Sequence, residues 1–328
     1  MTETASILSR GDVYSSADPF ATAIAFTGPA VSWVGEDEAA AVADGRQIDL
    51  DGDLVAPGFV HAGLRLTGDD PDPAALLAAG VTSVHVLGES AHVDAFLACA
   101  PAALAVTAYP QGADGERASV PAADLAAHAQ DDRALYVTVA DADQLAAVLE
   151  VLADPEVRTR SQRRLWRLLL DLPVPADAIE ALAATGIGIT LDPARHAQPL
   201  APLLSAGAQV SFALDTAQPW ETVAAAVYRT QAGISARAAF NAATRFGFRA
   251  LGRHEGGVLA PGAEATAVRW RVGELVVQVA DERLAAWSTD PRSGTPGLPD
   301  LADDAPRPEV VQVWVRGEQV ATGASGAA

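Results

Sequence analysis

The chain has 328 residues, half of them hydrophobic, and a formal net charge of −20. This apolar content is enough for a globular core and excludes a disordered chain. All 22 basic residues are arginine, which excludes chemistry that depends on lysine, such as a Schiff base, a P-loop or a carbamylated lysine between two metals. The excess of negative charge argues against a nucleic-acid partner and against an anionic membrane surface.

The first part of the chain, residues 1–54, alternates short apolar runs with turns. The runs 23–26 and 30–34 flank the turn pair Gly28-Pro29, and 47–50 precedes Asp51-Gly52. This period-two pattern predicts antiparallel sheet.

The middle of the chain, residues 55–256, alternates β-rich runs with windows rich in Ala and Leu, which is typical of βα units. Strands are predicted near 55–66, 81–87, 104–109, 134–140, 165–171, 187–192 and 209–215. Helices are predicted at 141–153, at 175–185 and, from the N-cap Ser235, at 235–251. The pattern predicts an α/β fold with a (β/α) barrel domain over 55–256.

The strand pattern returns after residue 257, at 265–272, 275–279 and 310–315. Because neither terminal segment is large enough to fold alone, we expect 1–54 and 257–322 to form one composite β-sandwich domain, followed by a flexible tail over 323–328. Only seven barrel strands are found, and the gap falls in 110–133. We therefore expect a shortened or distorted barrel with fewer than eight regular parallel strands.

Four stretches resemble the metal-dependent amidohydrolase superfamily. They are Leu-Val-Ala-Pro-Gly-Phe-Val-His-Ala at 54–62, Gly-Val-Thr-Ser-Val-His at 80–85, the helix around 233–240, and Gly-Val-Leu-Ala-Pro-Gly-Ala-Glu-Ala at 257–265. The resemblance implies a TIM-like barrel with a small β-sandwich, and hydrolysis of carbon–nitrogen bonds other than peptide bonds. It also implies zinc or a similar divalent metal, held at the C-terminal ends of the barrel strands.

The positions that hold the metal in this family differ here. The paired histidines of the entry strand fall on Gly63 and Arg65, and the later histidines fall on Val137 and Arg167. Of the family's metal-site positions, Asp215 is kept. Glycine, valine and arginine cannot ligate a cation, so we expect no metal cofactor and an impaired hydrolase.

Two alternatives concern the residues around Asp215. A divergent site of His61, His85 and Asp215 is one, in a pocket that would also include Gly63, Val137 and Asp192. In the other, Arg65 or Arg167 forms an ion pair with Asp215 and fills the former metal cavity. The competing interpretation is that both arginines extend to solvent from the barrel rim.

Three functions follow from these residues. The first is an impaired hydrolase of the family. The second is a non-catalytic binding or assembly partner, as a homo-oligomer or in a complex with a related active enzyme. The third is a metal-free enzyme in which Asp215 is the base and arginines polarise an anionic small molecule. The residues predict no nucleic-acid or membrane partner. A cytoplasmic protein is expected, because 1–10 lacks the pattern of a signal peptide.

Overall fold

A parallel sheet of eight strands forms the centre of the computed structural model, which describes residues 4–112, 115–229, 232–276 and 296–323. In spatial order the strands are β7 (Phe59–Arg65), β8 (Val81–Glu89), β9 (Ala105–Gln111), β10 (Arg117–Pro121), β11 (Ala134–Val139), β12 (Arg167–Leu170), β13 (Gly188–Leu191) and β14 (Gln209–Phe212). The outer strands β14 and β7 lie against each other, so the sheet is nearly closed. The predicted TIM-like barrel is confirmed.

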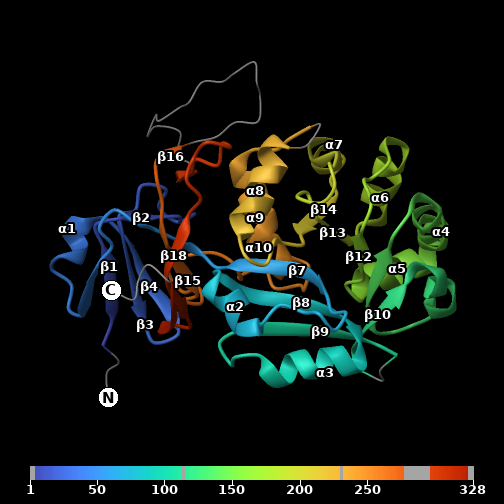
Figure 1. The fold of residues 1–328 in the computed structure, drawn as a ribbon, viewed down its shortest axis with the longest axis horizontal. Coiled ribbons are helices and arrows are strands. Elements are labelled where there is room, and N and C mark those ends of the chain that lie inside the picture. Colours follow the sequence, from blue (N-terminus) through green and yellow to red (C-terminus); the bar gives the residue numbers. More distant parts are fainter. Residues whose placement is uncertain (1–3, 113–114, 230–231, 277–295, 324–328) are drawn as a thin grey trace.

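Helices connect the strands and cover the outside of the barrel (Figure 1). They are α2 (Pro73–Ala78), α3 (Ser90–Cys99), η1 (Ala122–His128), α4 (Ala142–Ala153), α5 (Pro155–Arg163), η2 (Ala176–Ala178), α6 (Ile179–Thr185), α7 (Leu200–Ser205) and α8 (Pro219–Tyr228). The predicted helix 235–251 is two helices, α9 (Ala236–Ala243) and α10 (Arg245–Arg249), because the backbone leaves the helical region at Thr244. Ser235 caps α9 as predicted and accepts a hydrogen bond from the amide of Ala238.

The expectation of fewer than eight parallel strands is wrong, because β10 supplies the eighth strand. Only residues 112–116 separate it from β9, too few for a helix and a full return along the sheet. The register explains this short link: Ser119, in the middle of β10, lies opposite Gln111 at the end of β9. Strand β10 is therefore displaced along the strand direction, and the barrel is irregular at this place.

The two terminal segments build further sheets beside the barrel (Figure 1). One has the order β4-β3-β1-β5, with β1 (Ser6–Ser9), β3 (Ala23–Thr27), β4 (Ala30–Gly35) and β5 (Arg46–Asp49); α1 (Asp37–Ala40) joins β4 to β5. The other has the order β19-β18-β15-β6-β2, with β2 (Asp12–Val13), β6 (Leu54–Pro57), β15 (Ala267–Arg271), β18 (Glu309–Val315) and β19 (Glu318–Thr322). The described residues also include an antiparallel pair of short strands, β16 (Leu275–Val276) and β17 (Leu298–Pro299).

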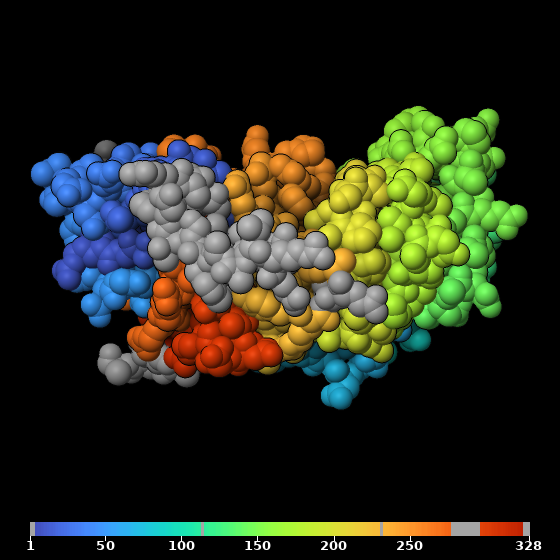
Figure 2. All heavy atoms as spheres, turned by 90° about the horizontal axis from the view of Figure 1, so that it is seen from above, coloured from blue at the N-terminus to red at the C-terminus, as the bar shows by residue number. Residues whose placement is uncertain are grey.

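Strands from both ends of the chain share one sheet and one core. Strand β6 pairs with β2 in parallel and with β15 in antiparallel register. Apolar side chains from both segments, among them Phe26, Val55, Ala267 and Trp314, form a common buried cluster. Figure 2 shows the N-terminal strands at one end of the molecule and the helices α4 to α6 at the other.

The strand predicted over 55–66 is divided at Gly58 into β6, which joins the terminal sheet, and β7, which opens the barrel. A Cβ atom at Gly58 would collide with the side chain of Thr82 on β8, so only glycine fits where the chain passes between the sheets. Within the described ranges, no helix is long and apolar enough to cross a membrane. Residues 324–328 of the predicted tail and 277–279 of the predicted strand lie outside the described residues.

Candidate functional site

Arg167 lies inside the barrel, near the N-terminal ends of the strands. It is the first residue of β12, and its side chain is fully buried. One of its terminal nitrogens, Nη1, lies 2.6 Å from Nδ1 of His85 on β8. The other, Nη2, donates to Thr190 Oγ1 at 2.8 Å and to Ser211 Oγ at 2.9 Å. One guanidinium therefore links three strands from inside the barrel.

The ring of Tyr136 also packs against Arg167. The guanidinium carbon lies 4.7 Å from the centre of the Tyr136 ring, a cation–π geometry. The Tyr136 hydroxyl lies 2.5 Å from both the Ala62 carbonyl oxygen and Thr190 Oγ1. No carboxylate of the described residues lies within 4.0 Å of the Arg167 guanidinium. The charge of this arginine is solvated by neutral oxygens, one imidazole and one ring.

Both histidines of the interior are held neutral. Arginine has no acceptor atom, so His85 Nδ1 must be the acceptor in the pair with Arg167. Burial, and next the charge of Arg167, hold the pKa of His85 well below its usual value. Burial lowers the pKa of His61 to about 4, although the charge of Asp215 opposes this change. His61 Nδ1 accepts from the Gly63 amide at 3.3 Å.

Gly63 has no room for a side chain. A Cβ atom there would lie 2.9 Å from the Tyr136 hydroxyl and 3.1 Å from both Leu169 Cδ1 and Thr190 Cγ2. These contacts are tighter than ordinary van der Waals contacts between such atoms. The space that a histidine would need at this position is filled by side chains of β11, β12 and β13.

The barrel mouth is built around Asp171, which directly follows β12. Its carboxylate lies 3.0 Å from Arg65 Nη1, 3.0 Å from Arg195 Nη1 and 3.1 Å from His196 Nε2. Beside Arg65 and Asp171 lies a cavity of about 110 Å³, lined also by residues of β11 and by Gln144. A second carboxylate, that of Asp192, lies near enough to Arg195 and His196 for their charges to lower its pKa, although burial raises it more.

The predicted ion pair with Asp215 does not form, and that hypothesis is wrong. Arg65 binds Asp171 instead, and Arg167 does not reach the mouth. Because the strands are parallel, the first residue of β12 lies at the N-terminal end of the barrel, and the mouth position of this strand belongs to Asp171. Asp215 is exposed, and its Oδ1 accepts from the amides of Ala217 and Gln218 at 2.9 and 2.7 Å.

The remaining pocket candidates are not gathered into one site. Val137 lies on the opposite face of β11 from Tyr136 and packs in the large apolar cluster between sheet and helices. Asp192 accepts from the amides of Ala194 and Arg195, both at 3.0 Å, and burial raises its pKa. The alternative metal site of His61, His85 and Asp215 is also not formed, since no three His, Cys, Asp or Glu side chains in the described part of the chain are placed to hold a metal ion.

The sequence analysis predicts no role for five residues of the site: Asp171, Thr190, Ser211, Tyr136 and His196. A signal for Asp171 was present, because side chains alternate along a strand and positions 167, 169 and 171 share one face. Nothing in the sequence alone indicates that Thr190 and Ser211 meet a guanidinium.

The interior does not fit a divalent metal. A dication would have to displace the buried positive charge of Arg167, and it would find glycine and arginine at the positions of the entry-strand ligands. The buried guanidinium of Arg167 is better suited to an anion or a neutral molecule than to a cation.

Comparisons with known proteins agree with the fold. Residues 172–320 match the model of the amidohydrolase family. The structure resembles a mutant of atrazine chlorohydrolase from Arthrobacter aurescens, solved with zinc and atraton, with a TM-score of 0.62, 16% identity, and coverage of 97% of this chain and 95% of that one. It also resembles N-isopropylammelide isopropylaminohydrolase from Burkholderia multivorans, with a TM-score of 0.64, 14% identity, and coverage of 98% and 99%. No curated protein matches the chain.

Proposed function

We propose that this chain is a member of the amidohydrolase family that has lost metal-dependent hydrolysis of carbon–nitrogen bonds and serves as a non-catalytic binding protein. The observation that carries the proposal is the Arg167 guanidinium inside the barrel, bonded to His85, Thr190 and Ser211. The lone cysteine, Cys99, rules out an intrachain disulfide, and this suits the cytoplasm as the compartment.

Loss of hydrolysis follows from the chemistry that the metal supplies in such barrels. A divalent metal lowers the pKa of a bound water and so creates hydroxide near neutral pH. Three protein ligands are the usual minimum for such a catalytic ion. Gly63 and Arg65 supply none, and the crowding at Gly63 argues that the interior has been repacked without a metal.

The metal-free enzyme is the weaker candidate. It requires Asp215 as a base beside an arginine that polarises the substrate, but both arginines have other partners. At the mouth, Arg65 and Arg195 both contact the Asp171 carboxylate, so neither is free to polarise a substrate beside Asp215.

Metal content and hydrolysis test the proposal together. The protein is purified from cultures supplied with zinc, manganese and iron, and its metals are measured by mass spectrometry. We expect a substoichiometric amount of each metal. We also expect no turnover of an amide, a urea or a chlorotriazine above the rate without protein. A chlorotriazine belongs to the panel because one structural neighbour is named for that activity.

The matched control is Asp215→Asn, which keeps the shape of the side chain and removes its charge. A stoichiometric metal, or a turnover that Asp215→Asn and a chelator both abolish, would contradict the proposal.

A further inference from the structure

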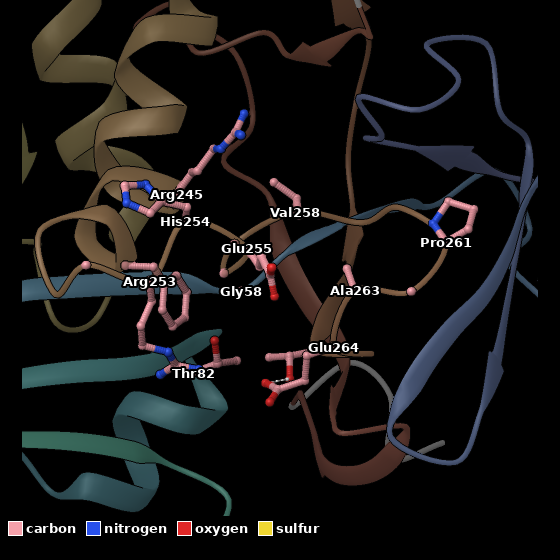
Figure 3. Close-up of a pocket in the computed structure, with 16 residues that line it drawn as sticks. Gly58, Thr82, Arg245, Arg253, His254, Glu255, Val258, Pro261, Ala263 and Glu264 are labelled. Atoms are coloured by element: carbon pink, nitrogen blue, oxygen red, sulfur yellow. Dashed lines mark hydrogen bonds between the residues drawn. The ribbon is translucent and has the colours of Figure 1, made fainter.

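A second and larger cavity lies at the opposite end of the barrel from the mouth. Its volume is about 850 Å³, within the range of small-molecule sites. It is lined by Gly58 and Thr82 at the starts of the barrel strands, by α10 and by the segment 252–264. Figure 3 shows it between the barrel strands on one side and the terminal sheets on the other. The cavity is therefore distinct from the position of the family's metal site.

Thr82, one of the residues that line this cavity, carries a buried and unsatisfied polar atom. Its side chain is 3% exposed, and its Oγ1 has no hydrogen-bond partner. A buried hydroxyl without a partner destabilises the folded chain. A valine of the same shape would avoid this cost, so the hydroxyl needs another explanation.

Two arginines line the same cavity without a carboxylate partner. Neither Arg245 nor Arg253 lies within 4.0 Å of an Asp or Glu oxygen in the described part of the chain, although the net charge is −20. Arg253 stacks on Phe248, with its guanidinium carbon 5.1 Å from the ring centre. Burial and the charge of Arg249 lower the pKa of Arg245. In Figure 3 the guanidinium of Arg253 extends toward Thr82, whereas Arg245 extends away from it.

The loop that carries Arg253 is held tightly against α10. A Cβ atom at Gly256 would lie 2.4 Å from the Phe248 ring, and one at Gly257 would lie 2.8 Å from Arg245 Cα. Only glycine allows this approach, so the loop backbone has a fixed place beside the two arginines. Two carboxylates also line the cavity. Glu264 is engaged by Thr266 at 2.8 Å and by Arg316 at 3.6 Å, and Glu255 is exposed.

We propose that this cavity binds a small molecule through one oxyanion group, a carboxylate or a phosphate, held between Arg253 and Thr82. Arginine presents a planar fork of donors that matches such a group, and the Thr82 hydroxyl adds one donor from the barrel wall. Glu255 and Glu264 limit the site to a single anionic group at this end. Arg245 contacts the remainder of the molecule. This site goes beyond the proposed function and does not depend on the absence of a metal.

Binding is tested with sodium acetate and sodium phosphate on the full chain, by calorimetry and by thermal unfolding. Sodium chloride of equal ionic strength is the reference, because any salt screens the repulsion within a protein of this charge. We expect at least one of the two anions to bind and to raise the melting temperature above that in chloride. The anion that binds shows whether the site prefers a carboxylate or a phosphate.

Thr82→Val separates binding from stability. We expect this variant to melt at the same temperature as the native chain or higher, and to bind the anion roughly ten-fold more weakly. Arg253→Met should abolish binding. Arg163→Met, on the exposed end of α5, should leave it unchanged.

Two results would overturn the site. One is that neither anion raises the melting temperature above the chloride reference. The other is that Thr82→Val and Arg253→Met bind as tightly as the native chain. If Thr82→Val does not fold, Arg253→Met alone decides, since its side chain is exposed.

Discussion

The Nη1 atom of Arg167 lies 2.6 Å from Nδ1 of His85, across the interior of the barrel. Both side chains could carry a positive charge, but two such charges at this distance would repel each other. Burial and the charge of Arg167 keep the pKa of His85 low, so only Arg167 is charged. A barrel that held a catalytic metal through histidine ligands would have imidazoles facing the metal. Here an imidazole faces a guanidinium and accepts a hydrogen bond from it.

Replacing Arg167 should therefore cost stability. Arg167→Met fills a similar volume but leaves His85 Nδ1 without its donor and removes the donor shared by Thr190 and Ser211. We expect the free energy of unfolding to fall by about 2–4 kcal/mol. Urea unfolding followed by circular dichroism measures this change. Arg163→Met is the control and should stay within about 0.5 kcal/mol of the native chain. Equal stability of the two variants would show that the buried network contributes nothing.

The buried histidines should make the protein sensitive to mild acid. The pKa of His61 is about 4 in the folded chain and near 6.5 in the unfolded chain, so the unfolded state binds more protons between these values. Stability is thus complete above pH 6.5 and falls as the pH drops, by about 3 kcal/mol in total for this one group. His85 acts in the same direction.

Urea unfolding at several pH values between 7.5 and 5 tests this dependence, above the range in which most carboxylates titrate. His61→Asn keeps an acceptor for the Gly63 amide and removes the titrating ring, so its stability should vary less with pH. His254→Asn, an exposed position, should keep the native slope. An unchanged slope in His61→Asn would contradict the explanation.

Gly63→Ala should be harmful although it adds one carbon. Its Cβ would press on the Tyr136 hydroxyl and on the side chains of Leu169 and Thr190. Overpacking of this kind costs about 1–3 kcal/mol. Gly115→Ala is the matched control, because the nearest atom to its Cβ is 3.9 Å away. Thermal unfolding should separate the two variants by several degrees.

The pair of Arg269 and Asp53 should be the strongest ion pair between the terminal segments. Arg269 Nε lies 2.5 Å from Asp53 Oδ2, and both side chains are nearly buried. Arg269→Met leaves the carboxylate buried alone, so we expect a loss of about 3 kcal/mol. Arg316→Met breaks the exposed contact with Glu264 and should cost under about 0.5 kcal/mol. Similar losses in both variants would refute the role of burial.

Much of the fold could be predicted because it follows from local patterns. The alternation of apolar strands and Ala/Leu-rich helices indicated the barrel, and Ser235 marked the start of α9. Strand β10 escaped notice because it is short and almost continuous with β9. The site was harder to predict from the sequence. Side chains inside a barrel stack in layers along its axis, and two residues touch only if they lie in neighbouring layers. Arg167 matched a family position by sequence, yet its layer at the start of β12 placed it next to His85 and away from Asp215.

The pairing of β6 with β15 has a consequence for how the chain is made. These strands are neighbours in one sheet, although the whole barrel separates them in the sequence. As the ribosome releases the chain from its N-terminus, β6 must wait with an open edge until the barrel has been synthesised and β15 emerges. Translation therefore sets the order in which the partners appear: β6 and the barrel strands are made first, and β15, β18 and β19 complete the sheet afterwards.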